Sequence, residues 1–141
     1  DFLRDPTPRC LPPTRPPDPA AALAVLDVIG EENLVHRANE IGARFKSRIE
    51  AMAKRHPGII GDIRINGAMM AIELVHNDDP HQANTELTQQ IIGHAQAHGL
   101  ILLSCGYYSN VIRFLPPLTI SDALIDEGFD KFDAIMAAIL G

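Results

Sequence analysis

An arginine stands inside an apolar run near the C-terminal end of the chain. Arg113 has Val111 and Ile112 on one side and Phe114 and Leu115 on the other, all of which favour burial. A buried arginine is costly unless its guanidinium reaches an anion or water. Its planar fork of donors suits a carboxylate held by two hydrogen bonds. Two interpretations stay open: a structural salt bridge or a side chain that reaches solvent at a strand end, and an anchor for a substrate carboxylate.

The remaining residues that could do chemistry form no recognisable catalytic pattern. His94 and His98 are four residues apart on a predicted helix and could supply two ligands to a metal ion. No H-E-x-x-H pattern accompanies them, nor does a cysteine or carboxylate partner, so we predict no metal site. Lys46, Lys54 and Lys131 lie among charged helical residues, whereas a Schiff-base lysine needs a desolvated setting. We therefore assign no catalytic residue to this chain.

Two further residues have an ordinary structural interpretation. Cys105, beside Gly106, could act as a nucleophile, but a small buried apolar side chain is the better fit to its surroundings. Asp62 is interpreted as a turn residue rather than as a general base. The chain also contains no glycine-rich loop with phosphate-binding spacing. The residues alone therefore indicate one unusual arginine, and they do not form a self-contained active site.

Composition and charge exclude several classes of protein. The 141 residues fit one domain of ordinary size, and hydrophobic residues make up 46%, enough for a packed core. The net charge of −6 argues against a nucleic acid or an anionic membrane surface as a partner. No apolar run approaches the roughly 20 residues that a spanning helix needs. Two widely separated cysteines do not make a disulfide framework, and we expect a cytoplasmic protein.

The first 19 residues differ in composition from the rest of the chain. Residues 1–19 contain seven of the 11 prolines, a density that excludes helix and central strand. We predict a disordered Pro-rich tail over residues 1–19 and one folded domain over residues 20–141. Asp18 is the expected N-cap of the first helix, with Pro19 at its first position.

Hydrophobic periodicity predicts helices and strands in the same domain. A run of good helix formers predicts a helix over residues 20–29. Apolar residues spaced by three or four predict helices over residues 31–56 and 84–98, and another after Thr119 as N-cap. Alternating or continuous apolar runs predict strands over residues 59–65, 68–75, 100–103 and 110–115. Asn66-Gly67 predicts a hairpin turn, and residues 76–83 are expected to form a polar loop. The fold class is therefore α+β, with a small, mostly antiparallel sheet of about four strands covered by helices.

From residue 20 onward the chain resembles the C-terminal small domain of the class III, fold type I, pyridoxal-phosphate-dependent aminotransferases. The resemblance rests on four stretches in family order, at residues 20–29, 60–64 together with 67–74, 99–106 and 110–120. The last stretch is the most specific, because a G-x-x-x-N-V-I-R-F-L-P-P-L run rarely arises by chance.

The resemblance implies a role for Arg113 and a reaction. In this family the matching arginine binds a substrate carboxylate, chiefly that of glutamate or 2-oxoglutarate. The implied reaction moves an amino group from 4-aminobutyrate, or a similar ω-amino acid, to 2-oxoglutarate. The implied cofactor is pyridoxal phosphate, the implied partners are amino-acid and 2-oxo-acid substrates, and the implied parent enzyme is a homodimer.

The sequence departs from the family pattern in two places. Residues 1–19 contain no G-G-T-x-x-G-N-P segment, whose threonine contacts the cofactor phosphate in the family, and the Schiff-base lysine falls outside this chain. The family's R-G-L-G turn reads Arg64-Ile65-Asn66-Gly67 here. We therefore expect the C-terminal part of a transaminase that is inactive alone. Two alternatives stay open: a non-catalytic binding or subunit-interaction module derived from the fold, and a fragment of an ornithine- or acetylornithine-type aminotransferase.

Overall fold

The computed structural model describes residues 19–141 in two compact units that divide between Leu34 and Val35. In its described part, the first unit is formed by helix α1 (Pro19–Glu31), which matches the helix predicted over residues 20–29. The predicted Pro-rich tail, apart from Pro19, and the predicted N-cap Asp18 lie outside the described residues. The second unit contains the sheet, three helices and the candidate site.

The second unit is built on an antiparallel sheet of five strands. The strands are β1 (Ile60–Asn66), β2 (Met69–His76), β3 (Asp79–Ala83), β4 (Leu103–Cys105) and β5 (Val111–Phe114). Four of them are ordered β1-β2-β5-β4, and β3 pairs separately with β2. The expected hairpin is present, with Asn66 opposite Met69 and Gly67 at a φ of 57°. The α+β class and the small antiparallel sheet are thus confirmed.

Strand β3 lies in the segment that was expected to be a polar loop, so that expectation was wrong. Asn77 and Asp78 both have positive φ angles, 54° and 58°, and connect His76 to its strand partner Asp79. Two consecutive residues in this conformation form the tight turn that suits the twist of a hairpin, and asparagine and aspartate tolerate it. The short polar strand after the turn lacks an apolar pattern, which is why periodicity did not reveal it.

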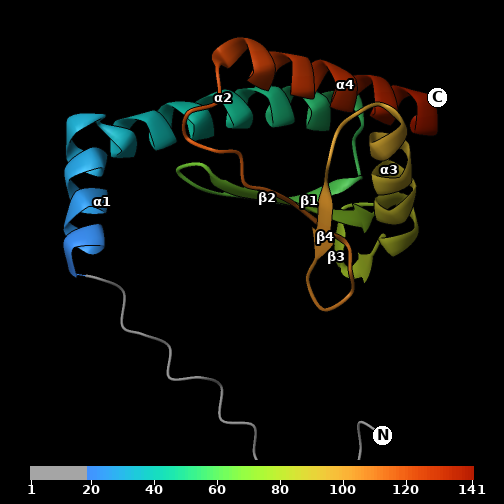
Figure 1. Cartoon of the computed structure of the whole chain (residues 1–141). Helices are drawn as coiled ribbons and strands as arrows, with labels where there is room; N and C mark the ends of the chain where they lie inside the picture. The colour runs from blue at the N-terminus through green and yellow to red at the C-terminus, as the bar shows by residue number, and fades with distance from the viewer. Residues whose placement is uncertain (1–18) are drawn as a thin grey trace, which may run out of the picture. The chain divides into compact units, whose positions relative to one another are not determined.

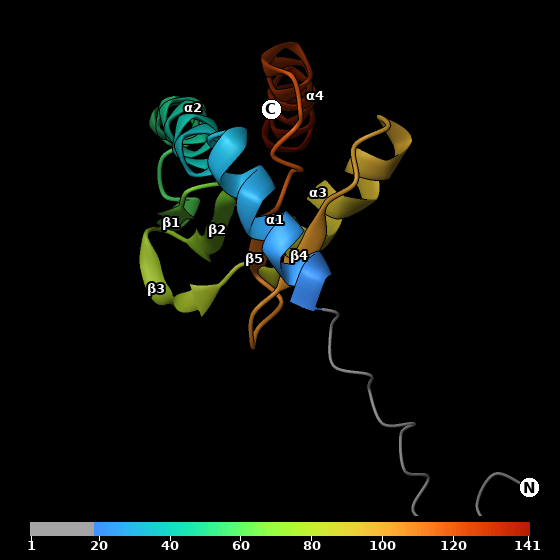
Figure 2. The same cartoon turned by 60° about the vertical axis from the view of Figure 1, so that its left-hand side comes forward.

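Three helices cover one face of the sheet (Figures 1 and 2). They are α2 (Leu34–Arg55), α3 (Thr85–Ala97) and α4 (Asp122–Leu140). Their apolar stripes and the inward-facing residues of β2 and β5 form one core, in which Ile72 and Ile112 are fully buried. Helix α2 lies beside α4, where Arg44 binds Asp126 at 2.9 Å. The opposite face of the sheet carries no such helix among the described elements of this unit.

The start of α4 corrects one prediction. Ser121, not Thr119, is the N-cap, and its hydroxyl accepts a hydrogen bond from the backbone N–H of Leu124 at 3.3 Å. Asp122, the first residue of α4, binds Arg37 at 2.8 Å and Arg44 at 2.7 Å. The carboxylate is drawn to two arginines of α2 that sequence spacing could not place beside it. Within residues 19–141, no helix combines the length and apolarity needed to cross a membrane.

Candidate functional site

Strand β5 sends alternate side chains to opposite faces of the sheet. Ile112 is fully buried in the core under the helices, and Phe114 packs against the same core. Arg113, between them, therefore projects from the outer face and is exposed. Leu115 was expected to be buried but is 64% exposed, because the strand ends at Phe114. The alternation explains how an arginine can stand inside an apolar run without entering the core.

The strand register places Arg113 in a row with three residues of the other strands. Arg113 is opposite Ala71 of β2 on one side and Leu103 of β4 on the other, and Ala71 is in turn opposite Arg64 of β1. Adjacent strands lie about 4.8 Å apart, so Arg64 and Arg113 are separated by two strand spacings. The short side chain of Ala71 stands between two cations on the same face.

Arg113 forms no side-chain hydrogen bond or ion pair with any described residue of the chain. The interpretation of Arg113 as one half of a structural salt bridge thus finds no support within residues 19–141. The guanidinium keeps its full set of donors for solvent or for a ligand carboxylate.

Arg64, in contrast, is bound by two acids on the same face. Its Nε donates to Asp62 at 2.7 Å, and a terminal nitrogen binds Oε2 of Glu73. The other oxygen of Glu73 accepts a hydrogen bond from Nδ2 of Asn110 at 3.3 Å. Asp62 was interpreted as a turn residue, which was wrong: it lies in β1 beside a register shift and binds Arg64. Sequence reasoning missed this network, although the hairpin register from Asn66-Gly67 puts Arg64 and Glu73 within reach.

Asn110 links this network to the start of β5. It is 2% exposed, and its Nδ2 also donates to the backbone oxygen of Leu74 at 2.9 Å. Its own backbone oxygen accepts a hydrogen bond from the N–H of Leu74 at 2.8 Å. These contacts fix the point at which β5 joins β2. A slip of one residue would turn Arg113 into the core, so the contacts of Asn110 help to set its direction.

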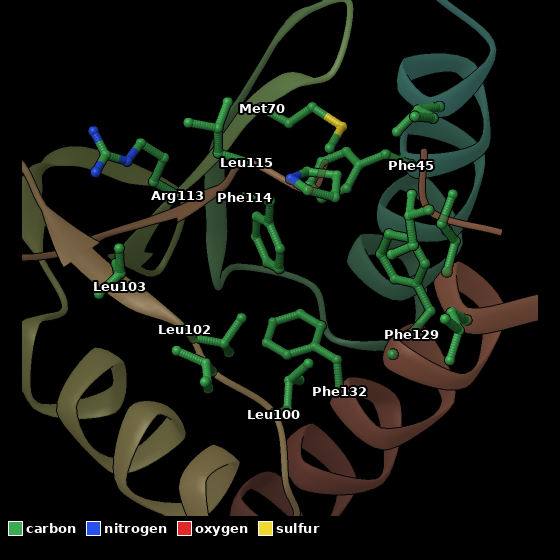
Figure 3. A pocket seen from close by; sticks show the side chains of 17 residues that line it. Phe45, Met70, Leu100, Leu102, Leu103, Arg113, Phe114, Leu115, Phe129 and Phe132 are labelled. Carbon is green, nitrogen blue, oxygen red and sulfur yellow. The ribbon is translucent and has the colours of Figure 1, made fainter. Parts of the chain in front are cut away.

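A mostly apolar cavity of about 420 Å³ lies beside Arg113, between the ends of β4 and β5 and helices α2 and α4. Figure 3 shows Phe114 directed into the cavity near Phe132, whereas the Arg113 side chain extends away from these rings. The rings of Phe45 and Phe114 lie 4.9 Å apart, and those of Phe114 and Phe132 lie 5.6 Å apart. Arg113 is the one charged residue among the described residues that line it.

The structure does not bring the other singled-out residues to this site. Nδ1 of His94 and Nδ1 of His98 each lie 2.8 Å from a backbone oxygen of their own helix. Lys46 pairs with Glu50 at 3.8 Å, and Lys131 pairs with Glu127 at 2.7 Å.

Lys54 and Cys105 also lie away from this site. Lys54 is exposed on α2, so none of the three lysines of the sequence lies in a desolvated pocket. Cys105 is a partly buried free thiol at the end of β4. Among the described residues, Arg113 is therefore an exposed cation without an ion-pair partner, and none of the three lysines has the desolvated setting that a Schiff base with a pyridoxal cofactor needs.

Comparisons with known proteins converge on one family. The family model described as aminotransferase class III matches residues 15–136. The chain is 49% identical over 110 residues to the 4-aminobutyrate aminotransferase GabT of Escherichia coli (strain K12), covering 78% of this chain and 26% of that protein. It is also 49% identical over 109 residues to the 5-aminovalerate aminotransferase DavT of Pseudomonas aeruginosa, covering 77% of this chain and 25% of that protein.

A solved structure agrees with these sequence relatives. A Bacillus anthracis aminotransferase superposes with a TM-score of 0.73 at 27% identity, covering 84% of this chain and 27% of that structure. The chain thus spans about a quarter of the length of the relatives it matches.

Proposed function

The chain belongs to the class III aminotransferases, and from this premise we propose that it is part of an enzyme that transfers an amino group to 2-oxoglutarate with pyridoxal phosphate as cofactor. The amino donor is an ω-amino acid, with 4-aminobutyrate and 5-aminovalerate favoured by the names of the relatives at 49% identity. The enzyme works in the cytoplasm as a homodimer. An ornithine- or acetylornithine-type donor is the alternative within the same reaction class.

The exposed and unpaired guanidinium of Arg113 is the observation on which this proposal rests. Its guanidinium is exposed and has no ion-pair partner among residues 19–141, so it can bind a carboxylate of 2-oxoglutarate or glutamate through two parallel hydrogen bonds. The strand around it is held in register by β2 and β4, which keeps the arginine directed outward. In this proposal Arg113 binds and orients the substrate and takes no proton.

The cofactor itself does not fit the residues of this chain. A pyridoxal cofactor acts as an electron sink and is held through a lysine Schiff base. All three lysines here are on helices, and Lys46 and Lys131 are paired with glutamates. We therefore propose that the chain is inactive alone and that the rest of the enzyme supplies the lysine and the phosphate site.

Replacing Arg113 in an active enzyme tests the anchor. In a chimera that carries this chain in place of the matching segment of the Escherichia coli relative, Arg113→Ala should raise the KM for 2-oxoglutarate about ten- to a hundredfold, the loss expected for hydrogen bonds to a charged group. The KM for the amino donor should change far less. Arg55→Ala is the control, because within residues 19–141 this exposed arginine forms its one ion pair with Asp133 on α4. Equal KM values for Arg113→Ala and Arg55→Ala would remove Arg113 from the site.

A second candidate function is a non-catalytic module derived from this fold, favoured by the lack of a suitable lysine. Borohydride reduction of the 141-residue chain with pyridoxal phosphate, followed by peptide mass spectrometry, bears on both readings. We expect no stoichiometric pyridoxyl adduct on Lys46, Lys54 or Lys131. A single stoichiometric adduct would show that the chain holds the cofactor by itself. Restored transamination on mixing with a chain that contains the missing part would favour the enzyme over the module.

A further inference from the structure

The two arginines on the outer face of the sheet have opposite environments. Arg64 is bound by Asp62 and Glu73, whereas Arg113 has no partner among residues 19–141. Both arginines are opposite Ala71 in the strand register, so they stand in the same row on opposite sides of β2. Position in the sheet therefore does not explain why only one of them is paired.

Glu73 is the acid closest to Arg113 in the register of the sheet. It is opposite Val111 in β5, which makes it a diagonal neighbour of Arg113 on the same face. Diagonal neighbours are about 7–8 Å apart, within reach of long side chains. An arginine and a glutamate in this relation are able to form an ion pair, and such a pair would occupy the donors that a substrate carboxylate needs.

Both oxygens of Glu73 are already engaged by other residues. Arg64 binds Oε2, and Nδ2 of Asn110 donates to Oε1 at 3.3 Å. Asn110 is held in place by its second hydrogen bond, to the backbone oxygen of Leu74 at 2.9 Å, and is 2% exposed. Glu73 is thereby held toward β1 and toward the start of β5.

We propose that Arg64 is a positioning residue: with Asn110 it holds Glu73 away from Arg113 and so keeps the Arg113 guanidinium available to a ligand carboxylate. The inference rests on the proposed function, in which Arg113 is the carboxylate anchor. Arg64 itself does not touch the substrate. Its effect is to remove a competing anion that belongs to the chain itself.

The chemical reactivity of Arg113 in the full 141-residue chain measures how available its guanidinium is. Phenylglyoxal modifies arginine side chains, and peptide mass spectrometry reports the rate at each arginine separately. In the Arg64→Met variant Glu73 is released, and we expect Arg113 to react about two- to fivefold more slowly, the range for an exposed ion pair. In Arg64→Met with Glu73→Gln the rate should return to the unmodified level, because a neutral side chain does not compete.

Asp62→Asn is the matched control, since it removes the other acid on Arg64 and leaves Glu73 bound. The rate at Arg55 serves as the internal reference. An unchanged Arg113 rate in Arg64→Met would overturn the inference, as would a rate that stays low when Glu73→Gln is added. Either result would mean that Glu73 does not compete for Arg113. If Arg64→Met loses its helical circular dichroism, Arg64→Gln replaces it and the same outcomes apply.

Adding 2-oxoglutarate to the unsubstituted chain separates this inference from the proposed function. Protection of Arg113 by 2-oxoglutarate, but not by its uncharged diamide or by chloride at equal ionic strength, supports the anchor. Lack of protection together with the rescue by Glu73→Gln would count against the anchor and leave the role of Arg64 standing. Protection without any effect of Arg64→Met would retain the anchor and remove the positioning role.

Discussion

At the scale of the residue, the space around a side chain decides what a substitution does. Gly42, inside α2, and Gly93, inside α3, have the same residue type in the same kind of element. A Cβ on Gly42 would lie 2.5 Å from the backbone oxygen of Gly67 and 3.1 Å from Cγ2 of Ile65. A Cβ on Gly93 would meet nothing within 4 Å. Glycine at position 42 is therefore required by the close approach of α2 to the β1–β2 hairpin.

These two glycines give opposite predictions. Gly42→Ala should lower the free energy of unfolding by about 1–3 kcal/mol, because the hairpin backbone must move to make room. Gly93→Ala should raise it by about 0.5–1 kcal/mol, because alanine restricts the unfolded chain and favours the helix. Urea unfolding followed by circular dichroism measures both. A stabilising Gly42→Ala would show that α2 does not pack on the hairpin as described.

At the scale of the element, helices α2 and α4 are joined by charges along their length. Arg37 and Arg44 bind Asp122, Arg44 binds Asp126, and Arg55 binds Asp133 at 2.8 Å. Hydrogen bonding from Arg37 lowers the pKa of Asp122 below its ordinary value of 3.8, with further lowering by the charges of both arginines. The amphipathic stripes bring the two helices together, and the charges add to the specificity of their pairing.

The lowered pKa of Asp122 predicts how stability changes in acid. A carboxyl group whose pKa is lower in the folded state stabilises the fold above its unfolded pKa, and this contribution is lost as the pH falls through the folded pKa. The free energy of unfolding should therefore decrease as the pH is lowered below about 4, where the unfolded carboxyl titrates. Urea unfolding at a series of pH values measures the loss, and Asp122→Asn should reduce its slope. An identical slope in that variant would mean that Asp122 does not contribute.

At the scale of the whole molecule, the second unit exposes apolar side chains around its cavity. Ile101, Leu103, Leu115 and Leu124 all line the cavity and are 87%, 55%, 64% and 57% exposed. Exposed apolar surface of this kind marks an interaction site or a tendency to associate. The chain spans about a quarter of the length of its relatives, so in the proposed enzyme further polypeptide is available to cover this surface.

The exposed apolar surface predicts self-association of the isolated chain. Sedimentation velocity should show a weight-average mass that increases with protein concentration. Leu115→Gln combined with Leu124→Gln should reduce this increase, because both side chains border the cavity. Tyr107→Gln is the control, since Tyr107 is 94% exposed but does not line the cavity. A chain that stays monomeric at all concentrations would contradict the prediction that this exposed apolar surface drives self-association.

The sequence by itself determined the elements and the family. Among residues 19–141, the spacing of apolar residues identified α2, α3 and α4, and good helix formers identified α1. Apolar runs identified four of the five described strands, because burial of a face leaves a period in the sequence. The isolated charge in an apolar strand identified Arg113, whose role as an anchor stays a prediction. β3 and the Ser121 cap were missed because a polar strand has no apolar period and several residues near a helix start can cap it.

Only the tertiary structure decided which charges meet. Arg64 lies in β1, Glu73 in β2 and Asn110 directly before β5, and their contact depends on the registers of β1 and β5 against β2. The pairing of α2 with α4 likewise joins residues about 80 positions apart. The local sequence does not predict which charges pair across such separations, because a charged side chain can bind any opposite charge that packing brings within reach. That Arg113 has no ion-pair partner among residues 19–141 is therefore visible only in the fold and not in the sequence of β5.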